Sequence, residues 1–296
     1  MTIRVAAIDI GSNTFKLTIA DLSPDGSIAQ RHSEAGVVRL GEGMTETGEI
    51  SRDRLDLAVE TLRALVERAN ADGVDRTIAV ATEAVRIARN RSHFVEAIRE
   101  RTGLAIDVID SRREAELTAT GVLAQIETSG RMLIIDIGGG STELISVDTG
   151  LVTGLTSVPL GSGNLTDQYV TADPPTAGEL ATIHAVITDA TRDFLHEVGP
   201  IDRLVLVGGV GEFALVVAEE RSPFNPGGLK RAMMRSQTIP AAQLARLIAA
   251  PVARARVVPA GFTIAQGIAE QCTPGSIEVV ANGLRYGLLL EAAKQN

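Results

Sequence analysis

The sequence has few of the side chains that stack on nucleobases or form covalent cross-links. Its 296 residues include no tryptophan, two tyrosines, six phenylalanines and one cysteine, Cys272. So few aromatic rings argue against a protein that binds single-stranded nucleic acid by base stacking. A lone cysteine excludes an intrachain disulfide, and it is typical of a reducing compartment, where we expect a buried structural thiol.

Long hydrophobic runs are also missing. The longest apolar run, 204–218, is interrupted by glycines and by Glu212, and it is shorter than a membrane span requires. The first residues, MTIRVAAIDIG, predict a strand and a polar turn without the apolar core or cleavage site of a signal peptide. We therefore expect a cytoplasmic protein with no membrane partner.

Positive charge is scarce too, because the formal net charge is −9. Proteins that bind nucleic acid or anionic lipid over a broad surface are usually basic, so no nucleic-acid partner is expected. A polyanionic substrate would instead need local positive charge in a cleft. Nearly all basic residues are arginines, which suit bidentate phosphate contacts. The same bias also fits an alanine- and arginine-rich genome.

Short β-branched runs alternate with segments of helical periodicity, and this alternation predicts an α/β fold. The expected strands are 3–9, 15–21, 76–81, 105–109, 132–137, 143–147, 152–158, 203–208 and 277–280. The expected helices are 52–71, 92–101, 112–127, 176–196, 240–249, 260–270 and 283–293. Ser51 is the expected N-cap of the first helix.

A weak internal repeat divides the chain into two similar halves. Residues 5–17 read VAAIDIGSNTFKL and residues 132–145 read MLIIDIGGGSTELI. Each copy is an apolar strand, an Asp-Ile-Gly turn and a second apolar strand. The halves join near 115–125 without a Pro-rich linker, so we expect the hinge inside or beside a helix.

The first of these turns, 9–14, has the composition of an anion-binding loop. Gly11 allows a sharp turn, and Ser12, Asn13 and Thr14 follow it with hydroxyl and amide groups. Asp9 could hold a hydrated Mg²⁺ at the same place. An ordinary β-hairpin would have the same composition, because Asp, Gly, Ser and Asn are common turn residues.

The second turn carries a stronger signal. Asp136 leads into three consecutive glycines, Gly138, Gly139 and Gly140, which are followed by Ser141 and Glu143. Three glycines make a hairpin entropically costly unless a ligand approaches the backbone closely. The two loops together predict a phosphate group held between two domains.

A third segment, 111–116, places carboxylates in the first turn of a helix. Acidic residues there favour the helix dipole, which explains them without any catalytic role. The alternative is that one of them is a general base for water, and spacing does not choose between Glu114 and Glu116. No zinc-type cluster, GxSxG motif or P-loop occurs in the sequence.

Five motifs, in order along most of the chain, resemble the exopolyphosphatase / guanosine pentaphosphate phosphohydrolase family, within the superfamily of actin, sugar kinases and heat-shock chaperones. They are AAIDIGSNTFKL with the following VVRLGEGM (37–44), ATEAVRIARN (81–90), SRREAELTATGV (111–122), IIDIGGGSTEL, and GLRYGLLLE (283–291). The resemblance is to the short two-domain form. It implies two actin-like (ribonuclease H-like) domains with an interdomain cleft, 1–121 and 122–282, with helix 283–296 packing back on the first.

The resemblance also implies roles for individual residues. Glu114 falls on the catalytic base, and Asp136 and Glu143 fall on catalytic acidic residues near the metal and the attacking water. The implied metal is Mg²⁺, with Mn²⁺ as an alternative, and the implied metal ligands are Asp136, Glu143 and Asp9. The implied phosphate-binding set is Ser12, Asn13, Thr14, Arg86, Gly138, Gly139, Gly140 and Ser141.

The sequence departs from the family pattern in several places. Residues 110–113 read Asp-Ser-Arg-Arg where Ser-Gly and acidic residues are usual, so the local charge is reversed. The segment 208–212 reads Gly-Gly-Val-Gly-Glu in place of a Gly-x-x-Gly-Thr turn, and we expect Glu212 to repel phosphate there. Asn164 stands where Arg is frequent, and Arg256 stands where Asp is usual.

These patterns and the resemblance predict an enzyme that hydrolyses terminal phosphates of inorganic polyphosphate or guanosine pentaphosphate, with magnesium and a glutamate base. The resemblance also implies a homodimer. One alternative is a catalytically weak paralogue that senses guanosine tetra- or pentaphosphate or a nucleotide. Another is a kinase or actin-like ATPase with a nucleotide pocket around 208–212. The sequence leaves open which phosphate substrate is preferred.

Overall fold

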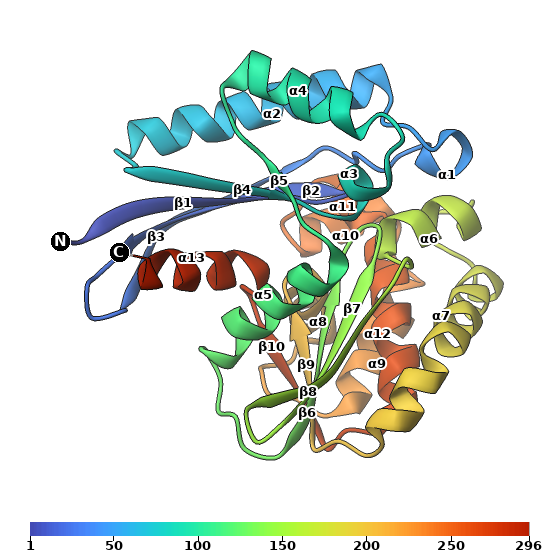
Figure 1. The fold of residues 1–296 in the computed structure, drawn as a ribbon. Helices are drawn as coiled ribbons and strands as arrows, with labels where there is room; N and C mark the ends of the chain where they lie inside the picture. Colours follow the sequence, from blue (N-terminus) through green and yellow to red (C-terminus); the bar gives the residue numbers. More distant parts are fainter. Residues whose placement is uncertain (296) are drawn as a thin grey trace. The chain divides into compact units, whose positions relative to one another are not determined.

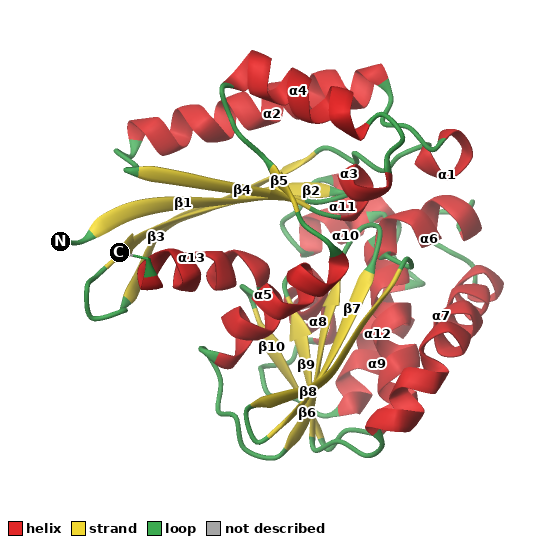
Figure 2. Ribbon diagram, viewed as in Figure 1, coloured by secondary structure: helices red, strands yellow, loops and turns green. Residues whose placement is uncertain are grey.

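The computed structural model describes residues 1–295, and its contacts divide the chain into two compact units. Unit 1 comprises Met1–Gly121 and the segment from Leu284 onward, and unit 2 comprises Val122–Gly283. The division between Gly121 and Val122 falls inside helix α5 (Ser111–Leu123). Strands and helices are coloured in Figure 2, and each unit is built around one sheet.

The sheet of unit 1 has five strands in the order β3-β2-β1-β4-β5 (Figure 1). The strands are β1 (Ile3–Ile10), β2 (Thr14–Leu22), β3 (Ile28–Val37), β4 (Arg76–Ala81) and β5 (Asp107–Val108). The first three strands pair antiparallel, and β4 and β5 continue the sheet in parallel from β1. The Asp-Ile-Gly turn therefore lies at the tip of the β1–β2 hairpin.

Helices cover both faces of this sheet (Figure 1). Helices α2 (Arg52–Ala71) and α4 (Arg91–Thr102) pack on the face that receives Ala6, Ile8 and Ile10 of β1. Helix α13 (Leu284–Lys294) packs on the other face, against Val5 and Ala7. Strand β1 is thus buried on both sides, which explains its nearly continuous apolar sequence.

The sheet of unit 2 repeats the topology of unit 1. Its order is β10-β9-β6-β7-β8. Strands β6, β7 and β8 pair antiparallel, and β9 and β10 continue the sheet in parallel from β6. The strands are β6 (Arg131–Ile137), β7 (Thr142–Asp148), β8 (Leu151–Val158), β9 (Arg203–Val207) and β10 (Ser276–Val280). The two copies of the sequence repeat occupy equivalent hairpins, β1–β2 and β6–β7.

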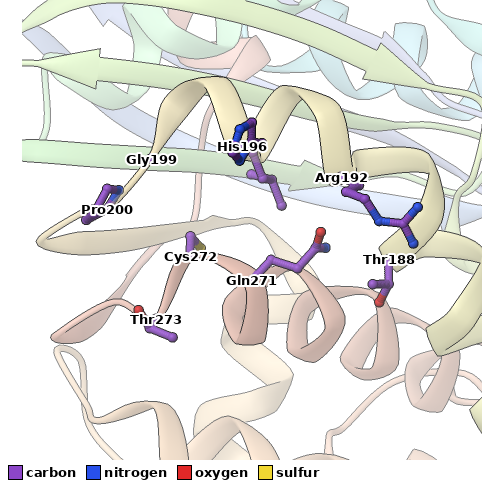
Figure 3. Close-up of a pocket in the computed structure, with 9 residues that line it drawn as sticks. Thr188, Arg192, His196, Gly199, Pro200, Gln271, Cys272 and Thr273 are labelled. Atoms are coloured by element: carbon purple, nitrogen blue, oxygen red, sulfur yellow. The ribbon is translucent and has the colours of Figure 1, made fainter.

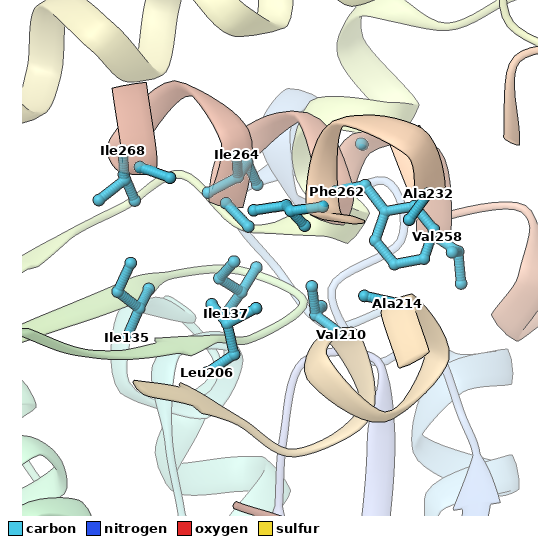
Figure 4. Close-up of a cluster of buried hydrophobic side chains, with 14 of the residues drawn as sticks. Ile135, Ile137, Leu206, Val210, Ala214, Ala232, Val258, Phe262, Ile264 and Ile268 are labelled. Atoms are coloured by element: carbon cyan, nitrogen blue, oxygen red, sulfur yellow. The ribbon is translucent and has the colours of Figure 1, made fainter. Parts of the chain in front are cut away.

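The core of unit 2 lies between this sheet and its helices. Helix α12 (Val258–Cys272) is buried along most of its length and packs on α7 (Ala177–Val198) and α9 (Pro226–Ser236). Figure 4 shows Ile268 and Ile264 of α12 facing Ile135 and Ile137 of β6. This packing fixes the end of β6 from which the glycine loop departs.

The remaining helices are short. They are α1 (Met44–Thr47), α3 (Glu83–Ile87), α6 (Ser162–Tyr169), α8 (Gly209–Ala218), α10 (Ala241–Leu247) and α11 (Val252–Ala255).

The predicted α/β fold is confirmed, and several element predictions need correction. Strand β3 was not expected, because its sequence IAQRHSEAGV is polar and only partly buried. The strand predicted at 105–109 shortens to Asp107–Val108, and the helix predicted at 112–127 ends at Leu123. Helices α1, α3, α6, α8, α9 and α11 were not predicted either. Segment 208–212 is not a turn, because α8 begins at Gly209.

Among residues 1–295, no single helix has both the length and the apolar character needed to cross a membrane. One sharply bent pair, Ala241–Leu247 with Val252–Cys272, meets the criteria of length and composition.

Candidate active site

The glycine loop of unit 2 is anchored through its carbonyl groups. Gly138 O accepts hydrogen bonds from the backbone N and Oγ of Ser162, at 2.9 and 3.0 Å. Gly139 O accepts from the backbone N–H groups of residues 163 and 164, and Gly140 O accepts from Asn164 Nδ2 at 2.9 Å. Within residues 1–295, the N–H groups of Gly139 and Gly140 donate no hydrogen bond. Two backbone donors therefore remain for an anion.

A row of three polar side chains crosses the sheet beside this loop. Asp136 on β6 lies opposite Glu143 on β7, which lies opposite Ser157 on β8. Glu143 is only 2% exposed, and its Oε1 accepts hydrogen bonds from Ser141 Oγ and Ser157 Oγ, both at 2.8 Å. The hydroxyl groups fix the orientation of the Glu143 carboxylate, which is paired in register with that of Asp136.

The loop of unit 1 is also fixed by its carbonyl groups. Asn13 O accepts from the N–H groups of Val38 and Arg39, and Ser12 O accepts from Gly41 N. Ser12 Oγ accepts from Ala84 N at 3.2 Å, which ties the loop to α3. The Asn13 side chain is 4% exposed, and its Nδ2 has no acceptor among the described residues. A buried donor of this kind is costly unless an acceptor, such as a phosphate oxygen, completes it.

Asp9 lies at the end of β1, opposite Lys16 on β2. Burial raises the pKa of the Asp9 carboxyl group, and the positive charges of Lys16 and Arg285 oppose that rise. Thr14 is buried at the first position of β2. These residues place one carboxylate and one cation at the base of the first loop.

Arg86 on α3 links two buried carboxylates. Its Nη1 donates to Glu114 Oε2 at 3.0 Å and to Ile109 O at 3.0 Å, and its Nη2 pairs with Glu83. Burial lowers the pKa of Arg86, but the charges of Glu114 and Glu83 and their hydrogen bonds outweigh burial and raise it. The guanidinium is therefore a permanent cation between the two glutamates.

The structure distinguishes the two glutamates of α5. The Glu114 side chain is 11% exposed and contacts Arg86, whereas the Glu116 side chain is 43% exposed and pairs with Arg112. Asp110 precedes the helix, and its Oδ1 accepts from Arg113 N at 2.7 Å. Arg113 itself pairs with Glu291. The reversed charge at 110–113 is thus compensated by acidic partners.

The segment 208–212 at the start of α8 holds one charged residue, Glu212, and a cation from a distant segment lies near it. Glu212 is exposed in the first turn, and the partly buried Arg254 interacts electrostatically with Glu212 and Asp136. Burial lowers the pKa of Arg254, and the two carboxylates oppose this. A Cβ at position 209 would lie 2.5 Å from Arg254 Nη2, so Gly209 makes room for the guanidinium. The repulsion expected from Glu212 is therefore offset by a nearby cation.

Carboxylate and water oxygens are the ligands that Mg²⁺ prefers. Asp136 and Glu143 supply two such carboxylates on neighbouring strands. The serine hydroxyl groups that donate to Glu143 provide the outer contacts that orient a metal ligand. Within the described residues, no group of three or more His, Cys, Asp or Glu side chains could hold a metal ion. The pair fits a magnesium ion that takes its other ligands from water or phosphate.

A pocket elsewhere in unit 2 does not suit phosphate. It has a volume of about 460 Å³ and lies between the last turns of α7 and α12, lined by Arg192, His196 and Gln271 among others (Figure 3). The carbonyl ends of helices disfavour anions. None of the predicted site residues lines this pocket.

Several residues that hold the site together could not be recognised as such in the sequence. Glu83 lies three positions before Arg86, and the i, i+3 spacing on a helix was a readable signal. Ser157 reaches Glu143 only through the β7–β8 register, which the sequence does not display. Asn164 was noted only as a departure from Arg, yet it binds Gly140 O, Pro159 O and Gly161 N.

Two units of identical sheet topology, each with an Asp-ended strand leading into a tight loop, define an actin-like α/β protein. The profile of the Ppx/GppA phosphatase family matches residues 19–296, and the chain belongs to this family. The structure resembles the crystal structure of the Aquifex aeolicus family member, with a TM-score of 0.79 and 29% identity over 100% of this chain and 99% of that one.

Curated relatives carry two kinds of name. Exopolyphosphatase 2 of Mycobacterium tuberculosis is 31% identical over 204 residues, which are 66% of this chain and 64% of that protein. The guanosine-5'-triphosphate,3'-diphosphate pyrophosphatase of Aliivibrio fischeri is 27% identical over 298 residues, which are 96% of this chain and 58% of that protein. The matched region therefore spans less than two thirds of either relative.

Proposed function

We propose that this protein is a phosphoanhydride hydrolase that releases terminal phosphates from inorganic polyphosphate, guanosine pentaphosphate or both. The observation that carries the proposal is the glycine loop of unit 2. Its carbonyl groups are bonded to the 161–164 segment, and the N–H groups of Gly139 and Gly140 remain as donors beside two carboxylates. Membership of the phosphatase family and the names of the relatives support the same class of reaction.

Both loops bind phosphate oxygens in this proposal. Gly138, Gly139, Gly140 and Ser141 supply backbone and hydroxyl groups from unit 2, and Ser12, Asn13 and Thr14 supply them from unit 1. The unpaired Asn13 Nδ2 supports this role, because an acceptor oxygen would remove the cost of burying it. Arg86 adds a positive charge that stabilises the developing negative charge of the transition state.

Glu114 is the general base in this proposal. A carboxylate that orients and deprotonates water must be ionised yet shielded from bulk solvent, and Glu114 is buried and paired with Arg86. The exposed Glu116 lacks that environment. Most of the remaining rate enhancement comes from positioning and from fixed charges, as in phosphoryl transfer generally.

Asp136 and Glu143 would hold Mg²⁺, or Mn²⁺ in its place, with Asp9 as an additional carboxylate. When bound, the metal offsets the negative charge of the phosphate oxygens. Ser141 and Ser157 hold the Glu143 carboxylate in place.

The single cysteine and the net charge of −9 support action in the cytoplasm on a free polyanion, without a nucleic-acid or membrane partner. We also propose a homodimer.

The test is magnesium-dependent phosphate release from long-chain polyphosphate, guanosine pentaphosphate and ATP in parallel. Glu114→Gln should lower kcat by about 10²- to 10⁴-fold, because a general base contributes that much. Glu116→Gln is the matched control, since it removes the same charge two residues away on the exposed side of α5, and it should stay within about twofold of wild type.

Full activity of Glu114→Gln would overturn the assignment of the base. Absence of release from all three substrates, together with tight binding of one, would instead identify a sensor. Preferential release from ATP would favour the ATPase alternative.

A further inference from the structure

The cluster of Glu83, Arg86 and Glu114 contains one carboxylate more than the proposed reaction uses. Glu83 is the first residue of α3 and is 9% exposed, the same fraction as Glu114. Burying an unpaired carboxylate is unfavourable, so a chain retains one only where a partner compensates it. The partner of Glu83 is Arg86, which is also the partner of Glu114.

The two terminal nitrogens of the Arg86 guanidinium contact different carboxylates. Arg86 Nη2 pairs with Glu83, while Nη1 binds Glu114 Oε2 and Ile109 O. The carbonyl group of Ile109 fixes the guanidinium from a third side. With both glutamates ionised, the cluster carries two negative charges and one positive charge. The cluster therefore has one carboxylate more than its single cation can neutralise.

This charge balance matters because an arginine bound to a single carboxylate makes that carboxylate a weak base. Opposite charge at hydrogen-bond distance favours the ionised form, and like charge nearby disfavours it. Glu83 supplies the like charge and also engages part of Arg86. Glu114 thereby keeps the affinity for a proton that a general base needs.

We propose that Glu83 is a positioning residue that acts through Arg86: it holds the guanidinium in place and shares its charge, so that Glu114 remains able to accept a proton from water. This inference rests on the proposed function of Glu114. It assigns Glu83 no contact with the substrate.

The charged neighbours of Glu114 on α5 and β5 that the structure describes have partners of their own. On α5 itself, Arg113 pairs with Glu291 of α13, and Glu116 pairs with Arg112. Asp110 accepts from Arg113 N at the start of the helix, and Asp107 of β5 interacts electrostatically with Arg113. Glu83 is therefore the carboxylate that shares a cation directly with Glu114.

The test is the pH dependence of kcat for Glu83→Gln, which keeps the shape and a hydrogen-bond acceptor but removes the charge. Arg86 then acts on Glu114 alone, so the acid limb of the profile should move to lower pH. The plateau value of kcat should fall by about three- to tenfold because the base is weaker, with KM within about twofold. A loss of packing alone would not move the acid limb to lower pH.

Two further variants make the comparison specific. Glu83→Asp keeps the charge and should restore a profile close to wild type. Glu96→Gln is the matched control, because Glu96 also pairs with an arginine at i+3, Arg99, but on the exposed face of α4. It should leave the profile unchanged. Thermal unfolding of each variant establishes that the folded fraction is the same.

A double variant separates this inference from the function on which it rests. Adding Glu83→Gln to Glu114→Gln should cause a smaller loss than Glu83→Gln causes in the wild-type background, because the effect of Glu83 on the base is already absent and only its hold on Arg86 remains. If Glu114→Gln is inactive and the acid limb of the pH profile does not move in Glu83→Gln, the role of Glu83 is overturned and the role of Glu114 stands. A fully active Glu114→Gln would overturn both assignments.

Discussion

Replacing Gly161 by alanine tests whether the glycine loop depends on the segment that supports it. A Cβ at position 161 would lie 2.5 Å from Gly139 C and from Gly140 N. Non-bonded carbon atoms prefer about 3.5–4.0 Å, so the loop must move by about 1 Å. The atoms in the way are backbone atoms, which cannot escape by changing a rotamer.

The two effects of this displacement should differ in size. Overpacking of this kind typically costs about 1–3 kcal/mol of stability, which leaves a stable domain folded. A shift of about 1 Å in groups that position a substrate can cost about 10²-fold in rate. We therefore expect a folded Gly161→Ala protein whose phosphate release falls by about two orders of magnitude.

Two other glycines provide graded controls. A Cβ at Gly163 would lie 2.8 Å from Gly139 O, so Gly163→Ala should be impaired less than Gly161→Ala. A Cβ at Gly178 in α7 would meet nothing within 4 Å, and Gly178→Ala should keep full activity and gain about 0.4–1 kcal/mol of stability. The assay is phosphate release combined with thermal unfolding of all three variants. Wild-type activity in a folded Gly161→Ala protein would refute the reasoning.

Two further predictions follow from hydrogen bonds of single carboxylates. Ser157→Ala removes one of the two hydroxyl groups that donate to the Glu143 carboxylate, and it should raise the magnesium concentration needed for half-maximal activity by about 10-fold. Ser129→Ala, which removes an exposed hydroxyl group, is the control. An unchanged magnesium requirement in Ser157→Ala would contradict the proposed metal site. The hydrogen bond from Arg4, aided by Arg31, lowers the pKa of Asp21 from 3.8 to about 2. Since the folded-state pKa is depressed, this stabilisation is complete above the unfolded value and is lost as pH falls toward about 2. Asp21→Asn should therefore lower the free energy of unfolding at pH 7, and the difference from wild type should narrow below pH 3. Denaturation of both proteins at each pH measures this, and equal stability at pH 7 would contradict the prediction.

The sequence predicted the regular elements well where apolar periodicity was strong. Helix α2 begins and ends as predicted, and Ser51 caps it by accepting a hydrogen bond from Arg54 N. Strand β3 escaped prediction because it lies at the edge of its sheet, where polar side chains are tolerated. Helix α8 escaped because its glycines resemble a turn, although Gly211 is small so that it can pack against Leu206 and Val279.

For the candidate site, too, some features can be predicted from the sequence and others cannot. Loops with a leading aspartate could be found from composition, because tight turns need glycine and anion binding needs small polar groups. The partners of those residues could not be found, because they depend on register and on contacts between distant segments. Ser157 on β8 and the bond from Asn164 to Gly140 are examples. The choice between Glu114 and Glu116 also required burial, which spacing on one helix turn does not reveal.

The order of packing around β1 has a consequence for how the chain folds during synthesis. Val5 and Ala7 are covered by Leu284, Leu288 and Leu289 of α13, which follow the whole of unit 2 in the sequence. Domains fold as their residues leave the ribosome. Unit 2 has all its strands by residue 280, while one face of the first sheet stays incompletely covered until α13 emerges. The unit that begins the chain is therefore the last to be completed, and its uncovered sheet face is the nascent surface most in need of protection from aggregation.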